Sequence, residues 1–277
     1  MRTQPPTSVF DLHHHVGHLD AIAGGSAATG APIGSAEDAR QRLTYMDAHH
    51  IGQALLMPGD YPLPGSGPTI SKINDDVRDY QELHPDRFPA RLATTDPRDL
   101  QASIDEIDRV TEMGGVSGFA WHHHFWGAFV NAPTMYPIME RIQQTGLPVF
   151  VHIIDGSFLE SPWRLEELSD SFPDTTFVAL DGFSSPDRGF WMPYLAERHA
   201  NWLFDTGVAI SVSHAIPAFI KRVGAERLLF GSDFYSSPRF FDIPFALYEL
   251  LNSTVDEASI EAVLRGNALR LLGLEDR

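Results

Sequence analysis

The sequence contains no cysteine. Disulfide bonds and thiolate chemistry are therefore excluded, and a bound metal would have to be held by histidine or carboxylate side chains. Positive charge is also scarce, since 20 lysine and arginine residues stand against 37 aspartate and glutamate residues, which gives a formal net charge of −17. Phosphate backbones are bound by clustered lysine and arginine, so nucleic acid is not an expected partner.

Long apolar segments are missing as well. No stretch approaches the roughly 20 apolar residues that cross a bilayer, and the N-terminal segment lacks the apolar run of a signal peptide. We therefore expect a cytoplasmic protein with no membrane partner, acting on a small-molecule substrate. Assembly into homo-oligomers is compatible with the sequence but has no specific signature in it.

What the sequence does contain is a regular alternation of short β-rich segments and longer helical ones. The segments predicted as strands are 9–16, 53–58, 89–94, 116–121, 148–153, 175–180, 201–206 and 227–233. Helices are predicted between them, over 35–50, 69–83, from Asp96 and Pro97 onwards, and over 134–145, 162–171, 187–198 and 215–223, with two further helical stretches at the C-terminal end.

Eight such βα units match an α/β fold, the (β/α)8 TIM barrel, in which crossover helices join parallel strands. The rival is an open doubly wound sheet, but no glycine-rich dinucleotide loop follows the first strand. We therefore predict a single barrel domain over residues 1–277, with extra C-terminal helices.

Histidine and aspartate residues stand at the carboxyl ends of three of these strands, where barrel enzymes carry their reactive groups. His13 and His15 end the first strand and share one face, because side chains alternate along a strand. His152 ends the fifth strand, and Asp233 ends the eighth. Imidazole nitrogens with one carboxylate suit Zn²⁺ and also Mn²⁺ or Fe²⁺. We predict one divalent metal ion, with zinc favoured, at His13, His15, His152 and Asp233.

A second histidine cluster, 122–124, follows the fourth strand. His122 and His124 are its preferred members, because alternate residues share a face, and either could act as a general acid or hold substrate. The other interpretation is a loop in which these imidazoles are merely solvated. Candidate substrate contacts in the loops after the sixth and eighth strands are Asp181, Arg188, Trp191, Tyr235 and Arg239.

The pattern Asp11-x-His13-x-His15, with His152 and the segment ending in Asp233, resembles the amidohydrolase superfamily. It is most similar to the amidohydrolase-related (amidohydrolase 2) branch of lactone hydrolases and metal-dependent decarboxylases, which the segments 201–206 and 265–274 also resemble. The resemblance implies that His13, His15 and His152 bind the metal. It also implies that Asp233 is a ligand or a proton carrier.

One position departs from that branch. Its members usually carry a histidine at the end of the sixth strand, where this chain has Leu180 followed by Asp181. In relatives that histidine protonates or orients the substrate, and in the decarboxylases it is the expected acid. Asp181 could take over a polar role there if the strand end is shifted. The fourth strand also offers no lysine to bridge two metals, so a single-metal site is expected.

Three functions are compatible with these residues. The leading prediction is hydrolysis of an ester, lactone or amide bond of a small organic acid by metal-activated water, with Asp233 as the base. The alternative is non-oxidative decarboxylation of a small aromatic or unsaturated acid, with Asp181 or a histidine of 122–124 as the acid. The third is a catalytically inactive barrel with a binding role.

Overall fold

The computed structural model of the chain describes residues 2–17, 34–59, 69–209, 212–235 and 242–275. Its strands are β1 (Val9–Val16), β2 (Ile51–Pro58), β3 (Ala90–Ala93), β4 (Val116–Trp121), β5 (Val149–His152), β6 (Phe177–Leu180), β7 (Trp202–Asp205) and β8 (Leu228–Leu229). They form one parallel sheet in the order β1 to β8. The sheet closes on itself, because the amide of Leu12 donates to the carbonyl of Phe230 and that of His15 to Phe234. The predicted (β/α)8 barrel is confirmed.

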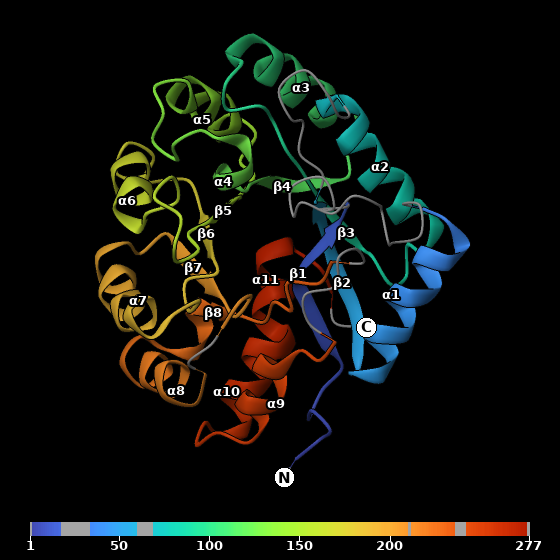
Figure 1. Cartoon of the computed structure of the whole chain (residues 1–277), viewed down its shortest axis with the longest axis vertical. Coiled ribbons are helices and arrows are strands. Elements are labelled where there is room, and N and C mark those ends of the chain that lie inside the picture. The colour runs from blue at the N-terminus through green and yellow to red at the C-terminus, as the bar shows by residue number, and fades with distance from the viewer. Residues whose placement is uncertain (1, 18–33, 60–68, 210–211, 236–241, 276–277) are drawn as a thin grey trace.

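Helices surround this barrel as a ring (Figure 1). They are α1 (Ala36–Ala48), α2 (Ile70–Leu83), α3 (Leu100–Met113), α4 (His123–Trp126), α5 (Met135–Gln143), α6 (Pro162–Asp170), α7 (Pro186–Arg198) and α8 (Val212–Val223). The extra C-terminal helices are α9 (Phe245–Leu251), α10 (Glu257–Glu261) and α11 (Asn267–Leu272), with a π-helical turn at Ala262–Gly266 before α11. Among the described residues, none of the helices has the length and apolar character needed to span a bilayer.

Side-chain caps start several of these helices where the sequence predicted a start. Ser35 accepts a hydrogen bond from the amide of Asp38, and Thr69 accepts one from Lys72. The third helix is a correction, because it begins at Leu100 and not at Asp96 and Pro97. Asp99 caps it by accepting from Ala102, while Asp96 forms a local turn by accepting from the amide of Arg98.

The strands pack two apolar layers. One lies between the strands and the helix ring, and the other fills the barrel interior. The interior layer contains Phe150 of β5 and Val178 and Leu180 of β6, and α11 closes it with Ala268 and Leu269. Figure 1 shows α11 near the centre of the ring. Because this end is filled, polar groups can gather only at the opposite, carboxyl end of the strands.

An irregularity in β1 sets which of its side chains face inward. Phe10 and Leu12 point into the interior layer, so strict alternation would place His14 there as well. The register with β2 shifts between Asp11 and His14, as in a β-bulge. After the shift His13 and His15 face the interior, and His14 turns outward to stack on Phe234.

Candidate metal centre

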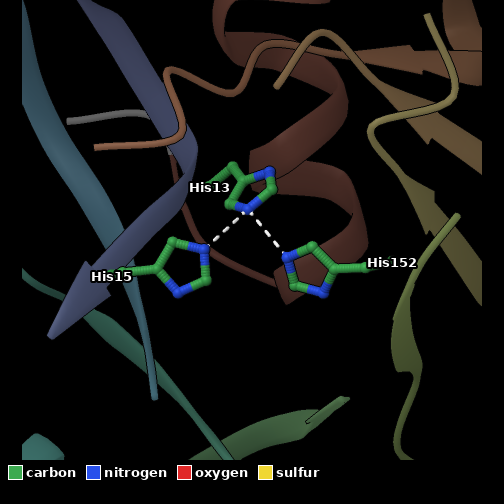
Figure 2. A group of neighbouring side chains, drawn as sticks. All are labelled: His13, His15 and His152. Carbon is green, nitrogen blue, oxygen red and sulfur yellow. Dashed lines mark hydrogen bonds between the residues drawn. The ribbon is translucent and has the colours of Figure 1, made fainter. Parts of the chain in front are cut away.

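Three imidazoles converge at the carboxyl end of the barrel (Figure 2). Nε2 of His13 lies 2.8 Å from Nε2 of His15 and 3.1 Å from Nε2 of His152. All three side chains are buried. Two ligands that each lie about 2.0–2.1 Å from one ion are separated by roughly 3 Å. The structure thus brings the predicted histidines together at a spacing that one metal ion can fill.

The outer nitrogen of each ring has an acceptor of its own. Nδ1 of His15 donates to the carbonyl of Pro58 at 3.0 Å, and Nδ1 of His152 donates to that of Trp121 at 2.8 Å. Nδ1 of His13 lies 2.6 Å from Oδ2 of Asp205. Carbonyl oxygens only accept, so the proton of His15 and of His152 sits on Nδ1 and the Nε2 lone pair faces inward. This is the tautomer that binds a metal through Nε2.

The protonation of these rings also fits a cation. Burial lowers the pKa of His15 to about 4 and that of His152 well below its usual range, so both rings are neutral. Burial opposes the charged form of His13 too, but Asp205, Asp233 and Asp181 raise its pKa to about 10. The carboxylates around His13 therefore favour a positive charge at this point, whether a proton or a metal ion supplies it.

Asp233 and Asp181 reach this centre from two different strand ends. Oδ1 of Asp233 lies 3.3 Å from Nε2 of His13 and 3.4 Å from Nε2 of His15. Oδ1 of Asp181 lies 3.8 Å from Nδ1 of His13. Both aspartates have left-handed backbones, with φ of 53° and 61°. That conformation costs energy in most residues but is tolerated by aspartate, and it often marks a functional site.

Leu180 and Asp181 show how the sixth strand is arranged. Leu180 is packed in the barrel interior with Phe150 and Val178. The left-handed turn at Asp181 places its carboxylate at the mouth, where its Oδ1 accepts from the amide of Val208. Burial, with the charges of Asp233 and Asp205, raises the pKa of Asp181 well above its usual range, against the effect of His13. Asp181 thus lies at the carboxyl end of the barrel, at the strand where the resemblance led us to look for a histidine.

Two glycines allow these groups to approach so closely. A methyl group on Gly207 would overlap Asp181 and His13, and one on Gly231 would overlap Asp205 and His13. Any larger residue at either position would push the Asp205–His13 pair apart.

A second carboxylate–histidine pair lies beside the three imidazoles. Nδ1 of His122 is 2.6 Å from Oε1 of Glu160, which is fully buried and also accepts from the amide of His124. The ring of His122 stacks on His152 with centroids 4.1 Å apart. One ligand-type atom each of His122, His152 and Asp181 lies within 4.8 Å of the others. Because His152 belongs to both groups, they form one continuous site.

Aromatic side chains wall the same mouth. Tyr235 stacks on His15 with ring centroids 4.0 Å apart, and Phe125 packs on His122 at 4.2 Å. Tyr235 and Trp126 form a small buried cluster with Phe125 at its edge. Aromatic rings thus pack directly on two of the imidazoles of the site.

The other predicted site residues lie elsewhere. His124 is exposed, with its ring 6.1 Å from that of His122, and it belongs to none of the groups of described residues that could hold a metal. Arg188 pairs with Asp155 at 3.1 Å, and Trp191 lines an outer groove between α6 and α7. Arg239 lies outside the described residues.

Three residues with direct roles in this geometry were not predicted as site residues. Asp205 is the last residue of the strand β7 and Glu160 lies in a loop, and neither belongs to a histidine motif. Asp11 is part of the quoted histidine motif, and it accepts from the amides of His13 and Ser232, which ties β1 to the segment that carries Asp233. The only sequence signal for Asp205 is its place at the carboxyl end of the seventh strand.

His123, the third histidine of the cluster 122–124, makes the stability of the protein depend on pH. It is fully buried, and burial lowers its pKa to about 4. This pKa is below the value of about 6.5 in the unfolded chain. The contribution of the neutral His123 to the free energy of unfolding is therefore fully present above about pH 6.5 and is lost as the pH falls towards 4.

We therefore expect wild type to lose about 2 kcal/mol more stability between pH 7 and pH 5 than a His123→Leu variant. Urea unfolding of both proteins at both pH values measures this. An identical pH dependence in wild type and His123→Leu would contradict the assignment.

Comparisons with known proteins agree with this architecture. A family model described as Amidohydrolase matches residues 10–274. No curated protein sequence matches the chain significantly. The solved 5-carboxyvanillate decarboxylase LigW of Sphingomonas paucimobilis has a TM-score of 0.72 at 17% identity, covering 96% of this chain and 99% of that one.

Two further solved structures are similar. One is the 5-carboxyvanillate decarboxylase LigW2 of Novosphingobium aromaticivorans, a mutant with bound manganese and 3-methoxy-4-hydroxy-5-nitrobenzoic acid, with a TM-score of 0.72 at 18% identity and coverage of 97% and 98%. The other is the 2,6-dihydroxybenzoate decarboxylase of Rhizobium, with a TM-score of 0.70 at 18% identity and coverage of 98% and 99%. At this level of identity the likeness shows a shared fold.

Proposed function

The chain belongs to the amidohydrolase family, whose model spans residues 10–274, and from that premise we propose that it is a metal-dependent decarboxylase of a small aromatic acid. The observation that carries the proposal is the position of His122, which is held by Glu160, faces the three-imidazole centre and is bordered by aromatic walls. Decarboxylation needs a proton donor for the ring carbon beside the metal, and His122 is placed to be that donor.

His13, His15 and His152, with Asp233, are the residues that would hold the metal. Three inward Nε2 atoms and a carboxylate oxygen suit zinc, manganese or iron. The ligand types favour zinc. The LigW2 relative binds manganese, which makes manganese an equal candidate. A divalent ion there would neutralise the substrate's carboxylate and an adjacent oxygen and hold both in place.

The proton transfer is assigned to the chain's own side chains. As the bond between the ring carbon and the carboxyl group breaks, CO2 leaves and the electron pair stays on that carbon. His122 donates a proton to the carbon, which forms the new C–H bond. Glu160 holds Nδ1 of His122 in place, while Asp181, with its raised pKa, is placed to return a proton to that ring.

The three relatives described above are named as decarboxylases, which supports this alternative over the hydrolysis that the sequence placed first. The substrates named for these relatives are aromatic acids, which favours an aromatic acid in particular. Hydrolysis would depend on Asp233 as a base, with His122 as the acid for the leaving group.

The test is a substrate panel on protein loaded separately with zinc and manganese. Release of CO2 from hydroxylated benzoates, with formation of the matching phenol, is the expected result. Turnover of lactones or esters without CO2 release would overturn decarboxylation in favour of hydrolysis. Absence of both activities in metal-loaded, folded protein would favour the inactive barrel.

Asp205 gives a prediction about the metal itself. It orients His13 through a 2.6 Å contact with Nδ1, so Asp205→Asn is expected to weaken metal affinity by about 10- to 100-fold. Competition with a fluorescent chelator measures this. Asp155→Asn is the matched control, since Asp155 pairs with Arg188 in the outer groove. An unchanged affinity in Asp205→Asn would show that this carboxylate does not support the metal.

A further inference from the structure

Asp11 is a fully buried carboxylate at the point where the first and last strands of the barrel meet. Its Oδ1 accepts hydrogen bonds from the amides of His13 and Ser232, at 3.2 and 2.8 Å. Its Oδ2 accepts one from the hydroxyl of Ser232 and lies 2.8 Å from Nδ1 of His14. Asp11 belongs to none of the groups of described residues that could hold a metal. A carboxylate that binds four donors in this place therefore has another task.

The bulge in β1 is the first feature that this carboxylate holds. In a regular strand, amides that donate to the same neighbouring strand are two residues apart. In β1 they are three apart, because the amides of Leu12 and His15 both donate to the segment that begins with β8. One residue is therefore extra, and the register with β2 shifts between Asp11 and His14. The amide of His13 lies in this interval and is accepted by Asp11.

The backbone on both sides of Asp233 is the second feature. Ser232 directly precedes Asp233 and donates to Asp11 through its amide and its hydroxyl. Phe234 directly follows Asp233, and the ring of His14 stacks on it with centroids 4.6 Å and planes 9° apart. Asp233 itself has a left-handed backbone, with φ of 53°. Such a conformation costs energy and persists where the surrounding structure holds it, which Asp11 does directly on one side and through His14 on the other.

We propose that Asp11 is a positioning residue of the metal centre, because it holds the bulge that turns His13 and His15 inward. It also holds the turn that brings Asp233 to these two rings. Without the bulge both rings would turn outward, since a slip of one residue moves each side chain to the other face of a strand. Figure 2 shows the arrangement that the bulge produces, with His13 and His15 directed toward His152. The inference rests on the metal centre of the proposed function and does not depend on which reaction the metal serves.

Metal affinity, measured by competition with a fluorescent chelator, tests this role. Asp11→Ala is expected to weaken the affinity for zinc by at least about 10-fold, because the ligand atoms would no longer be held around one ion. Asp11→Asn is expected to stay within about threefold of wild type, since an amide oxygen can accept from the same two backbone amides. The visible spectrum of the protein loaded with Co²⁺ reports the coordination geometry. It is expected to change in Asp11→Ala and to be kept in Asp11→Asn.

Glu106→Ala is the matched control, because it also removes a buried carboxylate with several donors. Glu106 lies on α3 and accepts from Ser71, Asn74 and Arg109. This variant is expected to lower the free energy of unfolding in urea and to keep the wild-type metal affinity and cobalt spectrum. A folded Asp11→Ala with wild-type affinity and spectrum would overturn the proposal. An equal loss of affinity in Asp11→Asn would overturn it as well, because the charge of Asp11 and not its hydrogen bonds would then be responsible.

Ser232→Ala is a milder variant that decides the matter if Asp11→Ala does not fold. It removes one donor to Oδ2 of Asp11 and is expected to weaken metal affinity about threefold and to alter the cobalt spectrum. Unchanged affinity and spectrum in this variant would overturn the inference. A wild type that binds no metal would overturn the metal centre and this inference with it. A wild type that binds metal but releases no CO2 would overturn the proposed decarboxylation alone.

Discussion

Replacing His13 with alanine is expected to remove the bound metal and to lower the rate of CO2 release by at least about 1000-fold, which corresponds to about 4 kcal/mol of transition-state stabilisation. Nε2 of His13 is in contact with Nε2 of His15 and with Nε2 of His152. Nδ1 of His13 is held by Asp205. Without this ring the proposed site would lack a ligand, and the positive charge that a metal would supply to the substrate's carboxylate would be lost. Elemental analysis of purified protein and steady-state kinetics measure the two effects.

This variant leaves Asp205 buried without its histidine, which could also destabilise the fold. His152→Ala separates the two effects, because it leaves only the carbonyl of Trp121 without its donor. His84→Ala is the control, since His84 caps the end of α2. Wild-type metal content and wild-type rate in both His13→Ala and His152→Ala would refute the metal centre.

Replacing His122 with asparagine is expected to lower kcat by about 100- to 10 000-fold while leaving the metal content unchanged. His122 stacks on His152 but is held through Nδ1 by Glu160, so its assigned task is to carry a proton and not to bind the ion. A general acid contributes to the rate of the chemical step, so KM should change little. Single-turnover measurements with a hydroxybenzoate substrate isolate this step.

Two neighbouring variants sharpen this result. Glu160→Gln should lower kcat less than His122→Asn does, because Glu160 acts only by orienting the ring. His124→Ala should keep close to the wild-type rate, since that side chain is exposed. Loss of metal together with activity in His122→Asn would instead identify His122 as a ligand, and an unchanged kcat would remove it from the mechanism.

Local patterns were sufficient for most of the fold. β1 begins and ends at the predicted residues, and the bounds of α2 were predicted to within one residue. Strand alternation, helix caps and helical periodicity all depend on residues that are close together in the sequence. The strict alternation of strands and helices predicted the barrel. The short helix α4 and the late start of α3 were missed, because each depends on turn geometry around one or two residues.

The sequence by itself determined that His13, His15, His152 and Asp233 stand at strand ends of one barrel, and parallel strands bring such ends to one rim. Only the tertiary structure decided how they meet. The bulge in β1 turns His13 and His15 inward against the pattern of Phe10 and Leu12. The pairs Asp205–His13 and Glu160–His122 join residues that are far apart in sequence, at distances set by barrel closure and loop packing. No local pattern encodes such contacts, and the proposed roles of the metal ligands and of the proton donor depend on them.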